Sequence, residues 1–340
     1  MILKLAWRNI WRNRRRTFIT VASILFAVLL SSLMESLQKG AWNNMIGNVV
    51  NYYTGFAQIH SRGYWEDQVI DNAFLLGDFQ RDLTADIPHV SNYLPRLESF
   101  ALASTGNKTS GVLVAGMIPE MEDRMSGVRD RLVSGAYLEE EEEAVLIGEE
   151  LADYLMMTTG DTLILISQGY HGVNATGKYP VKGIVRFGSP ELSKQMVYMP
   201  LPAAQWFFGA PGVVTSIALH IPRQKDTKGV VRTLASTLDT TRYEVMDWEE
   251  LLPELLEAKE MDSAGNYVVY FILYMVITFG IFGTILMMLK EREYEFGILV
   301  AIGMRKPKLA IITWLEIILM GLTGALAGIL LAFPVVWYFR

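Results

Sequence analysis

The sequence predicts an α+β membrane protein, in which transmembrane helices carry a large two-subdomain α/β domain outside the cytoplasm. Three apolar runs predict the helices, at residues 17–34, 267–289 and 309–339. The first two are uncharged and the third contains one charged side chain, Glu316. Each run is long enough to span about 30 Å of hydrocarbon as a helix. Residues 38–265, between the first two runs, are numerous enough to form a core of their own.

Charge is distributed unevenly along the chain and predicts its orientation. Residues 1–34 contain basic side chains and no acidic ones, and the short loop 290–308 has a basic excess. The whole chain nevertheless has a net charge of −6, so its acidic residues are concentrated in the outer domain. Because basic loops stay in the cytoplasm, we expect the loop inside and the acidic domain outside. The acidity also argues against nucleic-acid binding, and the absence of cysteine excludes disulfides and thiol chemistry.

Residues 1–16 predict an amphipathic, basic helix at the membrane interface. Trp7, Ile10 and Trp11 recur at helical spacing, and basic side chains surround them. A basic flank that only sets the orientation of the first span is the alternative. The first span is assigned to 17–37. A cleaved signal peptide is not favoured, because the apolar run is too long and no small-residue cleavage site follows it.

The outer domain, 38–265, alternates between strand and helix patterns. We expect one subdomain to combine a β-α-β unit near its start with another near its end, and a mostly β insert of residues 110–205 to form the second. The expected strands are 55–61, 93–103, 111–117, 144–147, 161–167, 179–186, 195–199, 214–221 and 243–246. The expected helices are 78–87, 149–157, 202–208 and 226–238, the last with Asp226 as its N-cap.

An amphipathic helix over 247–259 is expected to link the outer domain to the second span, 266–289. Asp247 and Glu250 form a capping pair at its start, and Pro253 falls within its first turns. The third span is assigned to 309–339. Small residues on the last two spans predict close helix packing, and they are Gly280, Gly283, Gly321, Gly324 and Gly328.

The loop 290–308 is expected to contain a short helix. Apolar side chains recur at i, i+3 and i+4 between Glu291 and Ile302. Gly303 can stop this helix, and Pro307 can open the next one. A tight hairpin connector is the alternative, although a connector does not need so many apolar residues. A short helix that is apolar on one side and acidic at its start is shaped to fit into a partner.

This loop also carries the most specific motif of the chain, E-R-x-x-E followed by an aromatic residue and G-x-L-x-A-I-G. The motif residues are Glu291, Arg292, Glu295, Phe296, Gly297, Leu299, Ala301, Ile302 and Gly303. The pattern resembles the permease signature of the FtsX/MacB/LolC-LolE superfamily of ABC transporter permeases. Six segments of the outer domain, from GVLVAGMIPE to VYMPLPAAQWFF, resemble the MacB-like periplasmic core in the same order. The sequence Trp7-Arg8-Asn9 is similar to the start of many members.

The resemblance implies a transport subunit that binds no cofactor or metal itself. The motif would form a coupling helix that docks on a separate cytoplasmic ABC ATPase dimer, and that dimer would bind ATP and Mg²⁺. A second permease copy or a paralogue would complete a complex in the bacterial inner membrane, with the multi-pass chain placing its large domain in the periplasm among membrane lipids. Without a fused ATPase, mechanotransmission by this permease would serve lipoprotein release, as in LolC and LolE.

The alternatives to lipoprotein release are MacB-like efflux of a peptide, toxin or small molecule, and FtsX-like envelope signalling. A membrane-anchored hydrolase is a third possibility. The family has four spans and this chain shows three, so we expect a C-terminal span to be absent from the sequence.

Two sets of residues are candidates for contact with a substrate. Glu316 lies within the third span, where exposure of a carboxylate to lipid costs about 2.5–3.5 kcal/mol. It should therefore face the substrate path, the partner permease or a neighbouring helix. Large side chains near the outer end of the first span are the second set, with stalk packing as the alternative, and they are Met34, Leu37, Trp42, Met45 and Ile46.

Other motifs do not point to catalysis. Residues 172–178 nearly spell a phosphate-binding loop, but Tyr179 replaces the required Ser or Thr and a strand pattern follows, so a hairpin tip is expected. The acidic run 139–143 is expected to be a solvated loop. The four histidines show no ligand spacing. We therefore expect this chain to be no enzyme.

Overall fold

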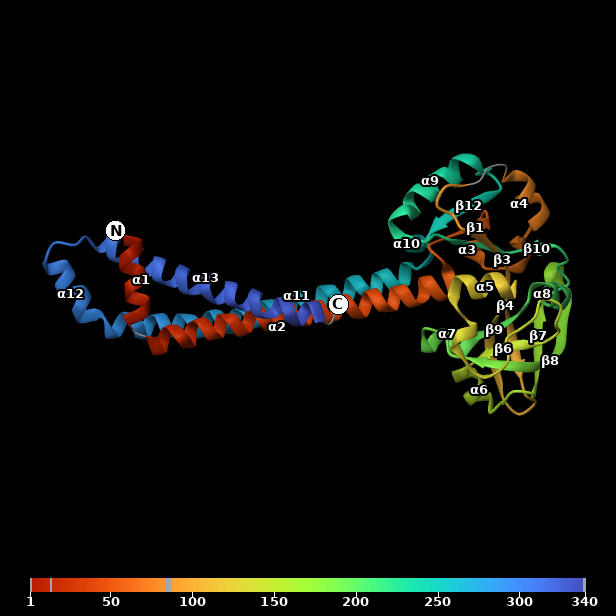
Figure 1. Ribbon diagram of the computed structural model, residues 1–340, viewed down its shortest axis with the longest axis horizontal. Helices are drawn as coiled ribbons and strands as arrows, with labels where there is room; N and C mark the ends of the chain where they lie inside the picture. Colours follow the sequence, from red (N-terminus) through yellow and green to blue (C-terminus); the bar gives the residue numbers. More distant parts are fainter. Residues whose placement is uncertain (1, 13, 84–86, 339–340) are drawn as a thin grey trace. The chain divides into compact units, whose positions relative to one another are not determined.

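The computed structural model describes residues 2–12, 14–83 and 87–338, which divide into two compact units (Figure 1). One unit contains Met1–Asn43 and Glu257–Arg340, and it is built from helices. The other contains Asn44–Leu256, and it is built from strands and short helices.

Helices with largely exposed apolar side chains form the first unit. They are α1 (Ile2–Arg12), α2 (Arg14–Val49), α11 (Pro253–Glu291), α12 (Glu293–Ala301) and α13 (Lys306–Tyr338). Among the described residues, three helices are long and apolar enough to cross a membrane, at Arg14–Thr54, Pro253–Glu291 and Lys306–Trp337. The three predicted spans are therefore confirmed as helices. α2 extends to Val49, beyond the predicted end of the first span at 37.

α13 packs on α2 through two of the small residues that predicted close packing. A Cβ atom on Gly324 would lie 2.8 Å from the Cβ of Ile24, and one on Gly328 would lie 2.9 Å from the Cβ of Val28. Only glycine allows this approach. Within the described residues, no atom lies within 4 Å of such a Cβ on the other three glycines, which are Gly280, Gly283 and Gly321.

The second unit contains a ten-stranded sheet and a separate two-stranded sheet. The strand order of the large sheet is β12-β1-β11-β3-β4-β9-β6-β8-β5, and β7 pairs with β3 and β8. The strands are β1 (Ala57–Ser61), β2 (Phe74–Leu75), β3 (Asn92–Ser104), β4 (Thr109–Met117), β5 (Leu132–Gly135), β6 (Val145–Gly148), β7 (Thr162–Gln168), β8 (Asn174–Val185), β9 (Met196–Pro200), β10 (Val213–Val214), β11 (Ser216–His220) and β12 (Tyr243–Asp247). The helices are α3 (Tyr64–Asp67), α4 (Leu76–Asp82), α5 (Pro119–Ser126), α6 (Glu149–Leu155), α7 (Pro190–Gln195), α8 (Leu201–Phe207), α9 (Thr227–Thr237) and α10 (Trp248–Leu251).

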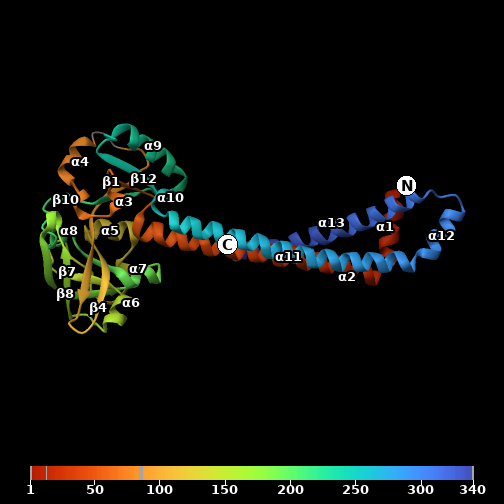
Figure 2. The same cartoon turned by 180° about the vertical axis from the view of Figure 1, so that it is seen from behind.

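Strands from both ends of the domain lie side by side, as the sequence predicted. β1 pairs with both β11 and β12, and β11 pairs with β3, all antiparallel. The β1-α4-β3 unit and the β11-α9-β12 unit are therefore each split by a strand of the other. Figures 1 and 2 show α4 and α9 beside these strands. The predicted β-α-β units are present, and their strands interleave in one sheet.

β3 joins this group of strands to the insert. Its first half pairs with β11, from Asn92 to Arg96, and its second half pairs with β4, from Leu97 to Ser104. The insert is thus continuous with the rest of the sheet through one strand of 13 residues. One cluster of buried apolar side chains extends across both groups of strands.

Several predicted elements differ from the structure at their ends. The helix expected over 78–87 ends at Asp82, and Thr84–Asp86 lie outside the described residues. The strand expected over 214–221 divides into β10 and β11, because β10 pairs with β2 in the small sheet. The expected strand 179–186 begins earlier, at Asn174, because it pairs with β7 from Gln168 onward. Asp226 precedes α9 without a side-chain cap hydrogen bond.

The link to the second span begins with the predicted capping pair. Asp247 accepts hydrogen bonds from the backbone of Glu249 and Glu250, and Glu250 accepts one from the backbone of Asp247. The expected single helix over 247–259 is nevertheless broken, because α10 ends at Leu251 and α11 begins at Pro253. Proline is well tolerated at the first position of a helix and poorly inside one.

Candidate functional site

The segment that carries the E-R-x-x-E motif forms a short helix between two long ones. α11 ends at Glu291, and Arg292 leaves the helical conformation (φ −100°, ψ 8°) before α12 begins at Glu293. At the other end, the N–H of Gly303 donates to the carbonyl of Val300, and the N–H of Met304 donates to that of Leu299, each at 3.0 Å. Gly303 has a φ of 100°, which favours glycine. The predicted stop at Gly303 is confirmed, while the helix begins two residues later than expected.

The acidic residues of the motif pair with basic residues of the N-terminal segment. Nη2 of Arg12 lies 2.6 and 2.5 Å from the carboxylate oxygens of Glu295. Arg16, in the first turn of α2, forms an ion pair with Glu291. The hydrogen bond from Arg12 holds the pKa of Glu295 below its ordinary value. These pairs were not expected from the sequence, although the opposite charges of the two segments are visible in it.

Glu316 lies at the centre of the same group. The residue is 2% exposed, and its carboxylate accepts hydrogen bonds from Nδ2 of Asn9 at 2.7 Å and from Nη1 of Arg292 at 2.9 Å. A buried carboxylate needs such partners, since an unpaired charge in a low-dielectric site is costly. A cavity of about 240 Å³ lies among these groups, and it is lined by Asn9, Ile10, Arg12, Arg16, Thr17, Met288, Glu291, Arg292, Glu295, Glu316 and Met320.

The apolar residues of the motif are divided between a groove and the exposed surface. Phe296, Gly297 and Val300 line an apolar cavity of about 830 Å³ together with residues of α11 and α13. Leu299 is half-buried, and Ala301 is exposed. Tyr294 and Ile302 are the most exposed large apolar residues of the segment 290–308, at 81% and 79%. α12 therefore presents large apolar side chains that the rest of the helical unit leaves uncovered.

The five candidates near the outer end of the first span all lie on α2, but their surroundings differ. Met34, Leu37 and Met45 are exposed. Trp42 donates a hydrogen bond to Asp262 at 2.8 Å and lines a cavity of about 400 Å³. Ile46 is buried against core residues of the α/β unit. Ile46 thus has the packing role, whereas the other four side chains are accessible.

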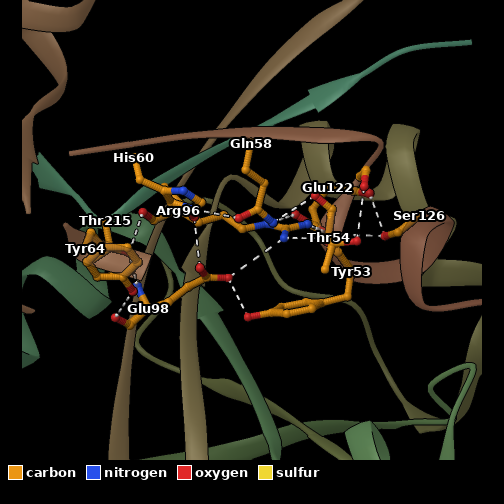
Figure 3. A network of polar contacts seen from close by, with 12 residues as sticks. Tyr53, Thr54, Gln58, His60, Tyr64, Arg96, Glu98, Glu122, Ser126 and Thr215 are labelled. Atoms are coloured by element: carbon orange, nitrogen blue, oxygen red, sulfur yellow. Dashed lines mark hydrogen bonds and ion pairs between the residues drawn. The ribbon is translucent and has the colours of Figure 1, made fainter. Parts of the chain in front are cut away.

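A second polar cluster, which the sequence analysis missed, lies inside the α/β unit around Arg96 (Figure 3). The Arg96 side chain is fully buried, and its Nε and Nη2 donate to Glu122 at 3.0 and 2.7 Å. Its Nη1 donates to the backbone carbonyl of Tyr53 at 2.5 Å. Burial alone would lower the pKa of Arg96, but the carboxylate of Glu122 raises it. Arg96 is therefore charged, and it joins β3 to α5.

The same cluster holds the turn of π-helix, Val50–Thr54, that continues α2. The hydroxyl of Tyr53 donates to Glu98 at 2.8 Å, and Ser216 donates to the other oxygen of that carboxylate at 2.9 Å. π-helical turns are rare and occur often at functional sites. We call these residues the Arg96 network, and it fixes the end of α2 to strands β3 and β11.

His60 lies at the edge of the Arg96 network (Figure 3). Its Nε2 is 2.8 Å from Oε1 of Gln58, and its ring stacks on that of Tyr64. Burial lowers the pKa of His60 to about 3, so the imidazole is neutral at neutral pH. Burial also raises the pKa of Tyr64.

The segment 172–178, which nearly spells a phosphate-binding loop, leads into strand β8 (Asn174–Val185), and Gly177 and Lys178 lie inside that strand.

Comparison with known proteins agrees with this architecture. The MacB-like periplasmic core domain family matches residues 17–237, and the FtsX-like permease C-terminal family matches residues 267–340. The lipoprotein-releasing system transmembrane protein LolC of Xylella fastidiosa is 25% identical, over 96% of this chain and 78% of that protein. LolC of Neisseria meningitidis is 21% identical, over 94% and 77%.

Two further proteins are similar over different shares of their length. The pyoverdine export ATP-binding/permease protein PvdT of Pseudomonas putida is 22% identical over 98% of this chain and 51% of that protein. The crystal structure of the periplasmic region of MacB from Actinobacillus actinomycetemcomitans covers 62% of this chain and 96% of that one, with 16% identity and a TM-score of 0.42. The matched families cover most of the chain, which therefore belongs to the FtsX/MacB/LolC superfamily of ABC transporter permeases, with a MacB-like periplasmic core domain and an FtsX-like permease region.

Proposed function

We propose that this chain couples ATP hydrolysis in a separate cytoplasmic ATPase dimer to a conformational change of its periplasmic domain, and that the cycle releases lipoproteins from the bacterial inner membrane. The similarity to LolC along 96% of the chain carries the proposal. ATP and Mg²⁺ would be bound by the ATPase, and a second permease copy or a paralogue would complete the complex.

The surface of α12 supports a role as the contact with the ATPase. Tyr294 and Ile298 on α12, and Ile302 directly after it, are large, apolar and exposed, and they lie outside the three spans. Single exposed apolar residues are common, but three such residues at a spacing of four, on one side of a helical segment, form a surface that a partner groove can bury. Docking of this helix would let the ATPase move it as its two subunits open and close.

The helices on both sides of α12 provide a path for that motion. α11 is one helix from Pro253 to Glu291, and α12 begins two residues after it ends. A continuous helix transmits a displacement along its axis because its hydrogen-bonded turns resist compression. On the periplasmic side, the Arg96 network would receive the motion, since it holds the π-helical end of α2 to the sheet.

Reconstitution tests this function. The chain would be co-expressed and purified with an ABC ATPase and a second permease from the same organism, and placed in liposomes that contain a triacylated lipoprotein. We expect ATP-dependent transfer of the lipoprotein to a soluble acyl-chain acceptor, and no transfer with a hydrolysis-deficient ATPase. ATP-driven movement of a small molecule, without lipoprotein transfer, would instead favour export, the candidate that the similarity to PvdT supports. Stimulated ATP turnover without any transfer would contradict both.

A further inference from the structure

We propose that the N-terminal helix α1, with the first turn of α2, is a clamp that sets the orientation of α12, and that Glu291, Arg292 and Glu295 are positioning residues held by it. The clamp consists of Asn9, Arg12 and Arg16. Its role in transport rests on the proposed function, but its existence does not.

The pairing has a regular register. Arg12 and Arg16 are four residues apart, and they pair with Glu295 and Glu291, which are also four residues apart. The two segments therefore run antiparallel where they meet, and each basic side chain has its own carboxylate. Asn9, a further turn before Arg12, reaches Glu316 on α13. The clamp thus contacts α11, α12 and α13 at once.

Burial shows which contact anchors the clamp. The Arg12–Glu295 pair is exposed on both sides, and such pairs contribute little on their own. Glu316 and Arg292 are different, because their side chains are 3% and 15% exposed and they bond to each other at 2.9 Å. Arg292 is also the residue at which the chain turns from α11 into α12. Its guanidinium therefore fixes the turn. The Arg16–Glu291 pair, in which Arg16 is largely buried, holds the end of α11, and the exposed Arg12–Glu295 pair sets the rotation of α12.

In this arrangement the charged residues of the motif and the apolar residues of the same segment have different roles. The charged residues, which the sequence analysis assigned to the ATPase interface, are satisfied within the chain. The exposed apolar residues Tyr294, Ile298 and Ile302 remain for the partner. Loss of the clamp should leave these side chains present but wrongly oriented, so that the ATPase still binds weakly while its turnover is no longer linked to the permease.

The absence of cysteine allows a direct test in the full-length, detergent-solubilised chain. A spin label on Y294C reports the mobility of α12 without any partner. We expect R12E/R16E to raise the mobility several-fold, and the charge-swapped R12E/R16E/E291R/E295R to restore it. R8E is the matched control, because Arg8 is an exposed basic residue of α1 with no ion pair among the described residues.

The clamp is refuted if the label has the same mobility in R12E/R16E as in R8E, or if the charge swap does not restore it. A second readout uses the complex with its ATPase. There we expect R12E/R16E to lose most of the permease-dependent stimulation of ATP turnover, and the charge swap to recover it. If the mobility changes as expected but no ATPase associates with the wild-type chain, the clamp stands and the proposed function fails.

Discussion

Replacement of Arg96 by methionine should severely destabilise the α/β unit. The substitution leaves the carboxylate of Glu122, which is 1% exposed, without its two charged hydrogen bonds. It also removes the donor to the carbonyl of Tyr53 and the nearby positive charge from the buried Glu98. Removal of one partner from a buried ion pair typically costs about 3–5 kcal/mol, because the other charge remains buried and unpaired.

The double variant R96M/E122M separates that penalty from the packing of the site. Both charges are then absent, and Glu98 keeps its hydrogen bonds from Tyr53 and Ser216. Apolar replacements of similar volume for a buried pair are often neutral or stabilising, so we expect the double variant to recover at least about 2 kcal/mol relative to R96M.

Urea unfolding of the detergent-solubilised chain, followed by tryptophan fluorescence, measures both variants. In a thermal melt of the same protein, a loss of about 4 kcal/mol in the free energy of unfolding corresponds to a fall in Tm of roughly 10 °C for a unit of this size. The control is R62M, which replaces an exposed arginine on the same unit. A cost of less than about 1 kcal/mol for R96M, or equal instability of R96M/E122M and R96M, would show that the buried charge of Glu122 does not depend on Arg96.

Three further predictions concern other parts of the chain. Because the pKa of His60 is about 3 in the folded protein and about 6.5 in the unfolded one, unfolding takes up a proton between these values. The contribution of His60 to stability should therefore be constant above pH 6.5 and fall by up to about 1.4 kcal/mol per pH unit between pH 6.5 and 3, and urea titrations of H60Q should show a shallower slope in that range. G303A should lower the free energy of unfolding by about 1 kcal/mol, because alanine is strained at the positive φ of this position, and it should raise the mobility of a label on Y294C. G297A should do neither, because there is open space around the added Cβ. G324V should lower the thermal stability of the helical unit by crowding Ile24, and equal melting of G324V and G280V would contradict the packing in the structure.

Local patterns predicted the elements that depend on nearby residues. Asp247 and Glu250 are three residues apart and cap α10 as expected. Gly303 ends α12 because its own backbone conformation allows it. The apolar runs predicted three spans because length and composition suffice for that purpose. β5 was missed because its residues are mostly exposed at the edge of the sheet and show no alternation.

Contacts between distant residues were beyond the reach of such patterns. Glu295 and Glu316 pair with residues 283 and 307 positions away, so no spacing rule connects them. Considered in isolation, each residue has a plausible role, as a partner contact or as a polar group in the membrane. Arg96 was missed for a similar reason, since it lies inside a strand whose neighbours are apolar and its partners come from α5 and from the end of α2.

The proposed coupling requires that a nucleotide-driven ATPase holds α12 through the exposed apolar side chains of that segment. Co-purification of the ATPase with I298D/I302D, compared with wild type and with R8E, tests it most directly. We predict that the double variant loses the ATPase while the α/β unit melts at the wild-type temperature, and that R8E retains it. Undiminished binding and stimulation of the ATPase by I298D/I302D would show that the ATPase docks elsewhere.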